Sequence, residues 1–118
     1  AMPSFQVFGG LGGQFLLEEL ARGAAGCLPG SAFPEVHVAI WSAWQSGRRD
    51  EAAAVYRAHM ALLRFAGQSA DWSHHAYKTL LHRRGVLSSP QVRPPTVEFD
   101  GIAREQLLGH AAAAGIPA

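Results

Sequence analysis

The sequence predicts an α/β fold that is mostly helical by content, with one strand–helix–strand unit followed by about four helices. Two short apolar runs, each stopped by glycine or proline, flank an amphipathic segment near the start of the chain. From Pro34 onward the apolar residues recur with the spacing of helices. Two strands leave both edges of a sheet unpaired, so we expect the chain to be the end portion of a larger fold.

The first unit begins with the run FQVF at residues 5–8, which we interpret as a buried strand stopped by Gly9-Gly10. Residues 14–22 are predicted to form a helix that keeps Glu18 and Glu19 away from its apolar face and ends at Gly23. The apolar face of this helix holds Phe15, Leu16, Leu17, Leu20 and Ala21. Residues 24–28 are predicted to form the second strand, and the helical crossover predicts that the two strands are parallel.

Helices account for most of the remaining chain. One follows Pro34 and ends at Gly47, and it carries Trp41 and Trp44 on a face that suits a core or a subunit contact. The next begins at Asp50 as its cap. Further helices are expected at about 71–84 and 100–114. Between these two, the proline-rich residues 86–99 predict an extended surface connection.

Composition excludes several classes of function. Hydrophobic residues make up 48% of the 118 residues, which argues against disorder. The formal net charge is +1 and the basic residues are scattered, so we expect neither a nucleic-acid nor a membrane partner. Cys27 is the only cysteine, which rules out an internal disulfide and favours a cytoplasmic location. In its predicted strand, Cys27 suits a small buried hydrophobe better than a nucleophile.

The glycine loop at residues 7–15, VFGGLGGQF, lies where phosphate-binding loops lie, but it does not match their patterns. The dinucleotide fingerprint needs a third glycine where Phe15 stands, and an acidic residue at a strand end about twenty residues later. No Lys-Ser or Lys-Thr pair follows the glycines, as a Walker loop would require. We therefore expect no nucleotide cofactor. Binding of a small anion by the Gly9–Gly13 loop is kept as an alternative.

Lys78 is the only lysine, so an imine mechanism within this chain would have to use it. His74, His75 and His82 lie nearby on the same predicted helix. A lysine beside histidines on a helix is usually solvated, whereas a nucleophilic lysine needs a desolvated site. Adjacent histidines also point about 100° apart, which suits a single metal ion poorly. We therefore predict no catalytic residue and no metal site in this chain.

Residues 7–35, VFGGLGGQFLLEELARGAAGCLPGSAFPE, resemble one part of the dihydrodipicolinate synthase and N-acetylneuraminate lyase superfamily. In that family, strand seven of a (β/α)8 barrel ends in a glycine turn and a Gly-Ala-x-Gly segment opens strand eight. The residues that match in order and spacing are Gly10, Gly23, Ala24, Gly26 and Pro34. The resemblance continues through Trp44, Gly47 and Asp50 and through AYKTLLHRRGVL at 76–87, and it covers about residues 5–95.

The resemblance implies that the chain is a C-terminal fragment of a TIM barrel. Residues 1–47 would form the last two strand–helix units, and residues 48–118 a helical extension. An intact relative would be a class I aldolase or lyase that acts on pyruvate or a related 2-oxo acid through a lysine imine, with no cofactor. The imine lysine, a relay tyrosine and the carboxylate-binding loop of the family all precede the matching part. We therefore expect the isolated chain to be inactive.

The resemblance also implies where substrate would bind. Gly9 and Gly10 would lie at the C-terminal end of strand seven, and Leu28, Gly30 and Ser31 at the mouth of strand eight. Some family members place acidic residues just after the first glycines, where they bind a polyhydroxylated substrate tail. Here residues 11–13 are Leu-Gly-Gly, which argues against a sialic-acid-like substrate and leaves the 2-oxo acid open.

A second interpretation is a helical module that associates with itself or with a partner and has no catalytic activity. The unpaired sheet edges and the apolar helix faces motivate it. Under either interpretation the expected partner is a second copy of the chain or the missing N-terminal half of the barrel. Residues 100–118 lie outside the resemblance, and their role stays open.

Overall fold

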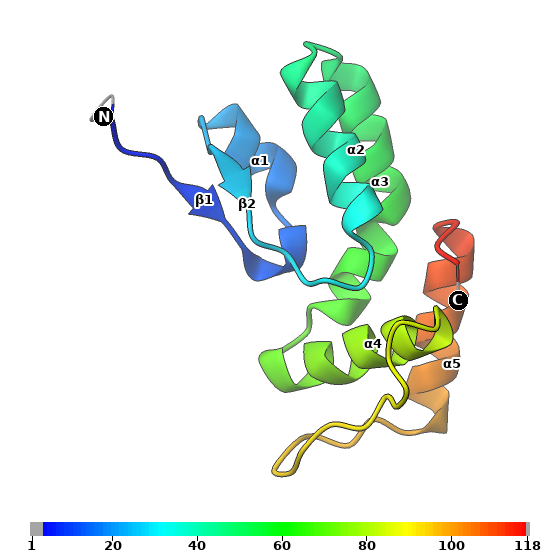
Figure 1. Cartoon of the computed structure of the whole chain (residues 1–118). Helices are drawn as coiled ribbons and strands as arrows, with labels where there is room; N and C mark the ends of the chain where they lie inside the picture. The colour runs from blue at the N-terminus through cyan, green and yellow to red at the C-terminus, as the bar shows by residue number, and fades with distance from the viewer. Residues whose placement is uncertain (1–3, 118) are drawn as a thin grey trace. The chain divides into compact units, whose positions relative to one another are not determined.

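The computed structural model describes residues 4–117 (Figure 1). The chain divides into two compact units, Ala1–Met60 and Ala61–Ala118. The elements in chain order are β1 (Phe8–Gly9), the 3-10 turn η1 (Leu11–Gly13), α1 (Leu16–Ala21), β2 (Gly26–Cys27), α2 (Pro34–Gln45), α3 (Arg49–Ala66), α4 (Ala70–Arg83) and α5 (Gly101–Ala113). The division into units falls inside α3. The boundary expected between residues 47 and 48 divides the barrel part of the chain from its helical extension. The division into compact units does not test that boundary, which stays a prediction.

The first unit is built on a two-stranded parallel sheet, in which Phe8 pairs with Gly26 and Gly9 with Cys27. The N–H of Ala25 donates to the carbonyl oxygen of Val7 at 2.8 Å, and the N–H of Leu28 donates to that of Gly9 at 2.9 Å. The parallel pairing follows from the crossover through α1. The predicted strand–helix–strand unit is therefore confirmed.

The predicted burial of the first strand is wrong. Both strands are only two residues long, and the exposed fractions of Phe5, Val7 and Phe8 are 69%, 58% and 52%. In the part of the chain that the structure describes, each strand has a neighbour on one edge alone. A strand becomes buried only when other elements cover its faces and edges, so an apolar run by itself did not determine exposure here.

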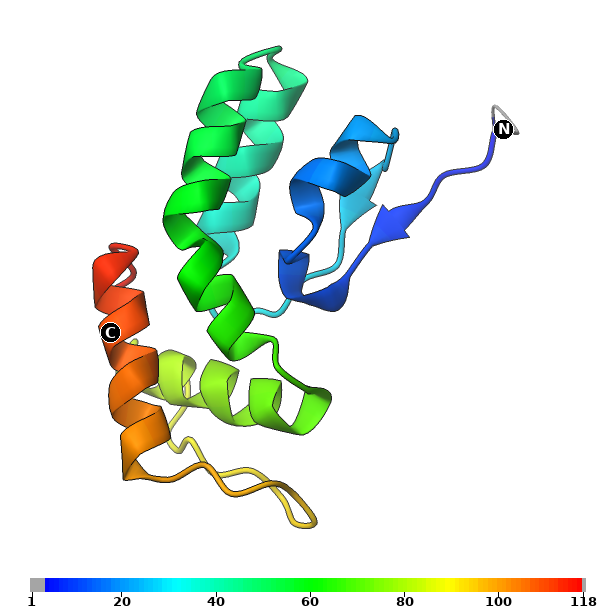
Figure 2. The ribbon, with the colours of Figure 1, turned by 180° about the vertical axis from the view of Figure 1, so that it is seen from behind.

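Helix α1 is shorter than expected, because it begins at Leu16 and ends at Ala21. Leu16 and Leu20 are buried, as the periodicity predicted, whereas Phe15 and Ala21 are exposed. The other buried apolar residues of this unit come from the loop before α2, from α2 and from the start of α3. They are Ala32, Phe33, Val36, Ile40, Ala43, Ala52 and Tyr56. Figures 1 and 2 both show α2 beside the first half of α3.

The turn between α2 and α3 differs from the expectation at Asp50, which lies inside the first turn of α3 instead of capping it. Arg49 closes this turn, because its guanidinium lies 3.8 Å from the centre of the Trp44 ring and donates to the Trp44 carbonyl oxygen. Trp41 and Trp44 are both half-buried.

The second unit contains α4 and α5, which contact each other. The hydroxyl of Ser69 caps α4 by accepting from the N–H of Trp72, and the Asp100 carboxylate caps α5 by accepting from the N–H of Ala103. Both helices lie within one residue of the predicted ranges. The buried apolar residues of this unit are Leu62, Leu63, Phe65, Ala66, Ala76, Leu80, Phe99, Ala103, Leu107, Ala111 and Ile116.

The extended connection at residues 86–99 is attached to α4 by polar contacts. Lys78 Nζ donates to the carbonyl oxygen of Gln91 at 3.0 Å, and His82 Nδ1 donates to that of Leu87 at 3.0 Å. His75 Nε2 lies 2.9 Å from Thr96 Oγ1. Of the residues that stood out in this part of the sequence, His75, Lys78 and His82 thus hold the connection in place. No helix within residues 4–117 is long and apolar enough to cross a membrane.

Candidate functional site

The candidate substrate site lies where the two parallel strands end. Leu28 is hydrogen-bonded through its N–H to Gly9, and a Cβ added at Gly10 would lie 3.9 Å from the Leu28 carbonyl oxygen. The structure thus brings Gly9, Gly10 and Leu28 together. Gly30, which is half-buried, and Ser31, which is exposed, lie in the connection that leaves the same strand end toward α2. Their role in binding substrate stays a prediction.

The glycine loop is a tight turn with left-handed backbone at three successive residues. The φ angles of Leu11, Gly12 and Gly13 are 51°, 64° and 79°. The N–H of Gly13 donates to the Gly10 carbonyl oxygen at 3.0 Å, and the N–H of Gln14 donates to that of Leu11 at 3.2 Å. An anion at this loop would have to compete for these two N–H groups, which weakens the anion-binding alternative.

His37 of α2 holds the middle of the glycine loop. Its Nε2 donates to the carbonyl oxygen of Gly12 at 3.3 Å, and its ring stacks on Phe33 with centroids 5.7 Å apart. A Cβ added at Gly13 would lie only 2.5 Å from His37 Nε2. The loop and the ring therefore pack so closely that a residue larger than glycine does not fit between them.

His37 is not among the site residues predicted from the sequence. Its one signal is a histidine among the apolar positions of a helix that directly follows the second strand. In the structure this side chain is buried together with Val36 and Ile40.

Tyr56 of α3 holds the end of the loop. Its hydroxyl donates to the carbonyl oxygen of Gln14, and Glu18 Oε2 lies 3.4 Å away. Burial, together with the charge of Glu18, raises the pKa of Tyr56 to about 12. The phenol is therefore a proton donor at neutral pH. It fixes the start of α1, and with it the direction in which the glycine loop leaves β1.

Burial lowers the pKa of His37 below its ordinary value of 6.5, although the carbonyl groups of Gly12 and Phe33 oppose this effect. A histidine whose folded-state pKa is depressed folds in its neutral form. Its contribution to stability is complete above the unfolded-state pKa, and it declines as the pH falls below that value.

We therefore expect the urea midpoint of the first unit to fall between about pH 7.5 and about pH 5, and to fall less in a His37→Gln variant, whose amide can also donate to Gly12. In a Trp72→Phe background, the fluorescence of Trp41 and Trp44, both in this unit, reports the transition. Equal losses in the two proteins would show that His37 does not carry the pH dependence.

The Glu19 carboxylate lies beside Gly9, which pairs with Cys27 in the sheet. Burial raises the pKa of the Cys27 thiol, and the negative charge of Glu19 adds to this effect. A thiol with a raised pKa contains little thiolate at neutral pH, so Cys27 is poorly suited to be a nucleophile. Glu19 was expected on the exposed face of its helix. Instead its Oε2 is buried and occupies the space that a Cβ at Gly9 would need.

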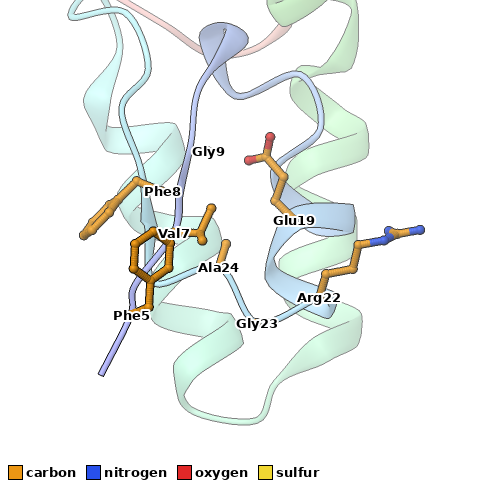
Figure 3. A pocket seen from close by; sticks show the side chains of 8 residues that line it. All are labelled: Phe5, Val7, Phe8, Gly9, Glu19, Arg22, Gly23 and Ala24. Atoms are coloured by element: carbon orange, nitrogen blue, oxygen red, sulfur yellow. The ribbon is translucent and has the colours of Figure 1, made fainter. Parts of the chain in front are cut away.

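Cavities lie along both strands. One of about 500 Å³ lies at β1 and is lined by Phe5, Val7, Gly9 and Glu19 among others (Figure 3). Another of about 350 Å³ is mostly apolar and lies between β2 and the start of α2. Within residues 4–117, no group of three or more His, Cys, Asp or Glu residues is placed to hold a metal ion.

Comparisons with known proteins agree with this geometry. No protein-family model matches the sequence. The chain is 33% identical over 93 residues to L-2-keto-3-deoxyarabonate dehydratase of Azospirillum brasilense, a match that covers 79% of this chain and 29% of the dehydratase. The crystal structure of dihydrodipicolinate synthase from Rhodopseudomonas palustris matches with a TM-score of 0.87 and 32% identity, over 94% of this chain and 36% of the synthase.

The chain belongs to the dihydrodipicolinate synthase superfamily. Its fold is that of a C-terminal fragment of the family's TIM barrel, with two strands and a largely helical remainder. It spans about a third of the length of the relatives it matches. Within this lyase family, the glycine loop and Leu28 lie at the C-terminal ends of barrel strands, where TIM-barrel enzymes build their active sites.

Proposed function

We propose that this chain is the C-terminal portion of a Schiff-base lyase or aldolase that acts on pyruvate or a related 2-oxo acid. The observation that carries the proposal is the meeting of Gly9, Gly10 and Leu28 at the C-terminal ends of two parallel barrel strands. The name of the Azospirillum relative adds support, because its substrate is a 2-keto acid.

In this proposal the chain supplies one wall of the site, and the rest of the barrel supplies the chemistry. Lys78 is on α4, where its ammonium group donates to a backbone carbonyl oxygen of the connection. An imine lysine must reach the keto carbon of the substrate at the strand ends. We therefore assign that role to a lysine outside these 118 residues, and we expect the isolated chain to be inactive.

Borohydride trapping with pyruvate tests the expected inactivity. Reduction of an imine makes it permanent, so intact mass and peptide mapping locate any adduct. We expect no adduct at Lys78 in the folded chain, and the same result with a Lys78→Arg variant, which also controls for reaction at the N-terminal amine. An adduct on Lys78 that is absent from Lys78→Arg would show that this chain has an imine site of its own.

The single cysteine and the small net charge support a cytoplasmic enzyme with no nucleic-acid partner, which we include in the proposal. The second candidate function, a partner-binding module without catalysis, is favoured by one observation. Phe5, Val7 and Phe8 are exposed next to a sheet edge.

A further inference from the structure

We propose that Leu11 and Leu28, the leucine pair, form an apolar contact surface for the substrate, and that the 2-oxo acid bound there carries a hydrocarbon tail. The inference rests on the proposed function in one respect, because it takes the ligand to be a 2-oxo acid bound at the strand ends. It identifies the class of that acid and the two side chains that select it.

Leu28 lies on the face of the strand pair that points away from α1. A Cβ added at Gly9 would meet the Glu19 carboxylate of α1, so Gly9 marks the face that α1 covers. Side chains alternate along a strand, and Figure 3 accordingly shows Phe8 and Glu19 on opposite sides of β1. A Cβ added at Gly26 would lie 2.6 Å from the Phe8 ring, so this position is on the uncovered face. Leu28 is two residues beyond Gly26, which places its side chain on the same face.

The exposure of the leucine pair is high. The exposed fractions of Leu28 and Leu11 are 75% and 65%, and that of Leu28 is the highest among the large apolar residues that the structure describes. The two are close in the fold, because Leu11 follows Gly10, and a Cβ added at Gly10 would lie 3.9 Å from the Leu28 carbonyl oxygen. Covering these side chains removes apolar surface from water, which favours a ligand with a hydrocarbon tail.

The backbone at Leu11 supports a functional role for its side chain. Its φ is 51°, and within residues 4–117 it is the only residue other than glycine with a positive φ. This left-handed conformation favours glycine, asparagine and aspartate, whereas a leucine adopts it under strain. Residues held in such conformations are concentrated at functional sites. We therefore assign the Leu11 side chain to contact with a ligand, because the turn itself would form more readily with another residue.

The surface around the leucine pair offers few polar groups to a hydroxylated tail. Among residues 9–13 and 28–31, the only polar side chain is that of Ser31. The N–H of Gly13 and the side-chain amide of Gln14 both donate to carbonyl oxygens within the turn, at 3.0 Å and 3.3 Å. A tail with several hydroxyl groups would lose hydrogen bonds to water here and regain few of them. A hydrocarbon tail has no such bonds to lose, so this surface selects for it.

The first test titrates the full 118-residue chain with two 2-oxo acids of equal charge and follows the NMR chemical shifts of the backbone amides. The probes are phenylpyruvate, whose tail is a hydrocarbon, and 2-oxogluconate, whose tail is a polyol. We expect phenylpyruvate to shift the amides of residues 10–13 and 28–31 with a Kd of about 1–10 mM, the range for a ligand of this size. At the same concentration 2-oxogluconate should leave these amides unchanged. Shifts caused by both acids, or by neither, would overturn the proposal.

Two variants test the leucine pair itself. Leu11→Asn and Leu28→Asn each remove an exposed apolar side chain, and asparagine suits the left-handed backbone at residue 11, so both variants should fold. Circular dichroism checks their folding. Each should bind phenylpyruvate at least about threefold more weakly than the unaltered chain. The matched control is Val38→Asn on α2, where the side chain is 60% exposed and the affinity should change less than about twofold. Unchanged affinity in both leucine variants would contradict the role of the leucine pair.

A hybrid enzyme separates this proposal from the proposed function. In the Azospirillum dehydratase, the stretches that align with residues 9–13 and 28–31 are replaced by those of this chain, and 2-oxo acids are trapped with borohydride. Trapping of pyruvate, with a gain for phenylpyruvate over 2-oxogluconate relative to the unaltered dehydratase, supports both proposals. Trapping of pyruvate without that gain contradicts the hydrocarbon tail alone. A folded hybrid that traps no 2-oxo acid, when the unaltered dehydratase does, contradicts the proposed function, and the titration of the chain then decides the contact surface.

Discussion

Replacing Phe99 with alanine is expected to destabilise the second unit by about 3–5 kcal/mol, the usual cost of truncating a buried phenylalanine. The exposed fraction of Phe99 is 9%, and its ring packs edge-on against Trp72 with centroids 4.9 Å apart. The Phe99 ring also stacks on the His75 ring, with ring centroids 5.3 Å apart and an angle of 2° between the ring planes. Loss of the ring removes both aromatic contacts and leaves a cavity where the connection meets α4.

The measurement is urea unfolding followed by tryptophan fluorescence in a Trp41→Phe/Trp44→Phe background, in which Trp72 alone reports the second unit. The matched control is Val97→Ala, two residues earlier in the same connection, where the side chain is 40% exposed and the expected change is within about 0.5 kcal/mol. Hydrogen exchange should show faster exchange in α4 and α5 for Phe99→Ala. If the two variants lost similar amounts of stability, Phe99 would not be the residue that anchors the connection.

Phe99 also shows what the sequence could and could not predict in the second unit. The prolines at 90, 94 and 95 indicated an extended surface connection, and the structure has no helix or strand there. The same pattern did not show that the last apolar residue of this stretch is buried. No local signal indicated it, because the fourth residue of the helix that follows is Arg104, and Phe99 packs instead on Trp72 and His75 of α4. The helices themselves were predictable, because their apolar spacing and caps are local.

In the first unit the parallel strand pair was predictable, because the crossover is short and its direction is constrained. The burial of that pair was not, because it depends on strands outside these residues. The orientation of Glu19 was also missed. An amphipathic pattern assigns a glutamate to the exposed face, but Gly9 leaves a space beside the sheet that the carboxylate occupies. The pattern describes one helix and does not contain the shape of its neighbour.

In the candidate site, too, some residues could be predicted from the sequence and others could not. The glycines and Leu28 were predictable from the family resemblance, which indicates where the strands end. His37 was not, because a histidine on an apolar helix face is more often an ordinary core residue than a loop anchor. Its partner is a backbone carbonyl oxygen 25 residues earlier in the chain. Every residue has a backbone carbonyl group, so the sequence does not indicate which one a distant histidine will contact. Only the fold shows this pairing.

The close packing of His37 on the loop leads to the second large expected effect. Gly13→Ala should destabilise the first unit by about 2–4 kcal/mol, for two separate reasons. Its φ of +79° is a conformation that an alanine adopts at a cost of about 1–2 kcal/mol. In addition, the new Cβ would lie 2.5 Å from His37 Nε2, in a ring that is buried and held by Phe33. The ring cannot move away without disturbing the core.

Gly23→Ala separates the two causes. Gly23 has a φ of +88°, but a Cβ there would meet no atom within 4 Å, so its substitution should cost only the backbone term of about 1–2 kcal/mol. The difference between the two variants is the cost of the clash, and it is measured by urea unfolding in a Trp72→Phe background, with Trp41 and Trp44 as reporters. In a His37→Ala background, Gly13→Ala should cost only the backbone term, because the ring that the new Cβ would meet is gone. If Gly13→Ala were no worse than Gly23→Ala, His37 would not restrain the glycine loop. The shape of the strand end would then depend on the left-handed backbone alone.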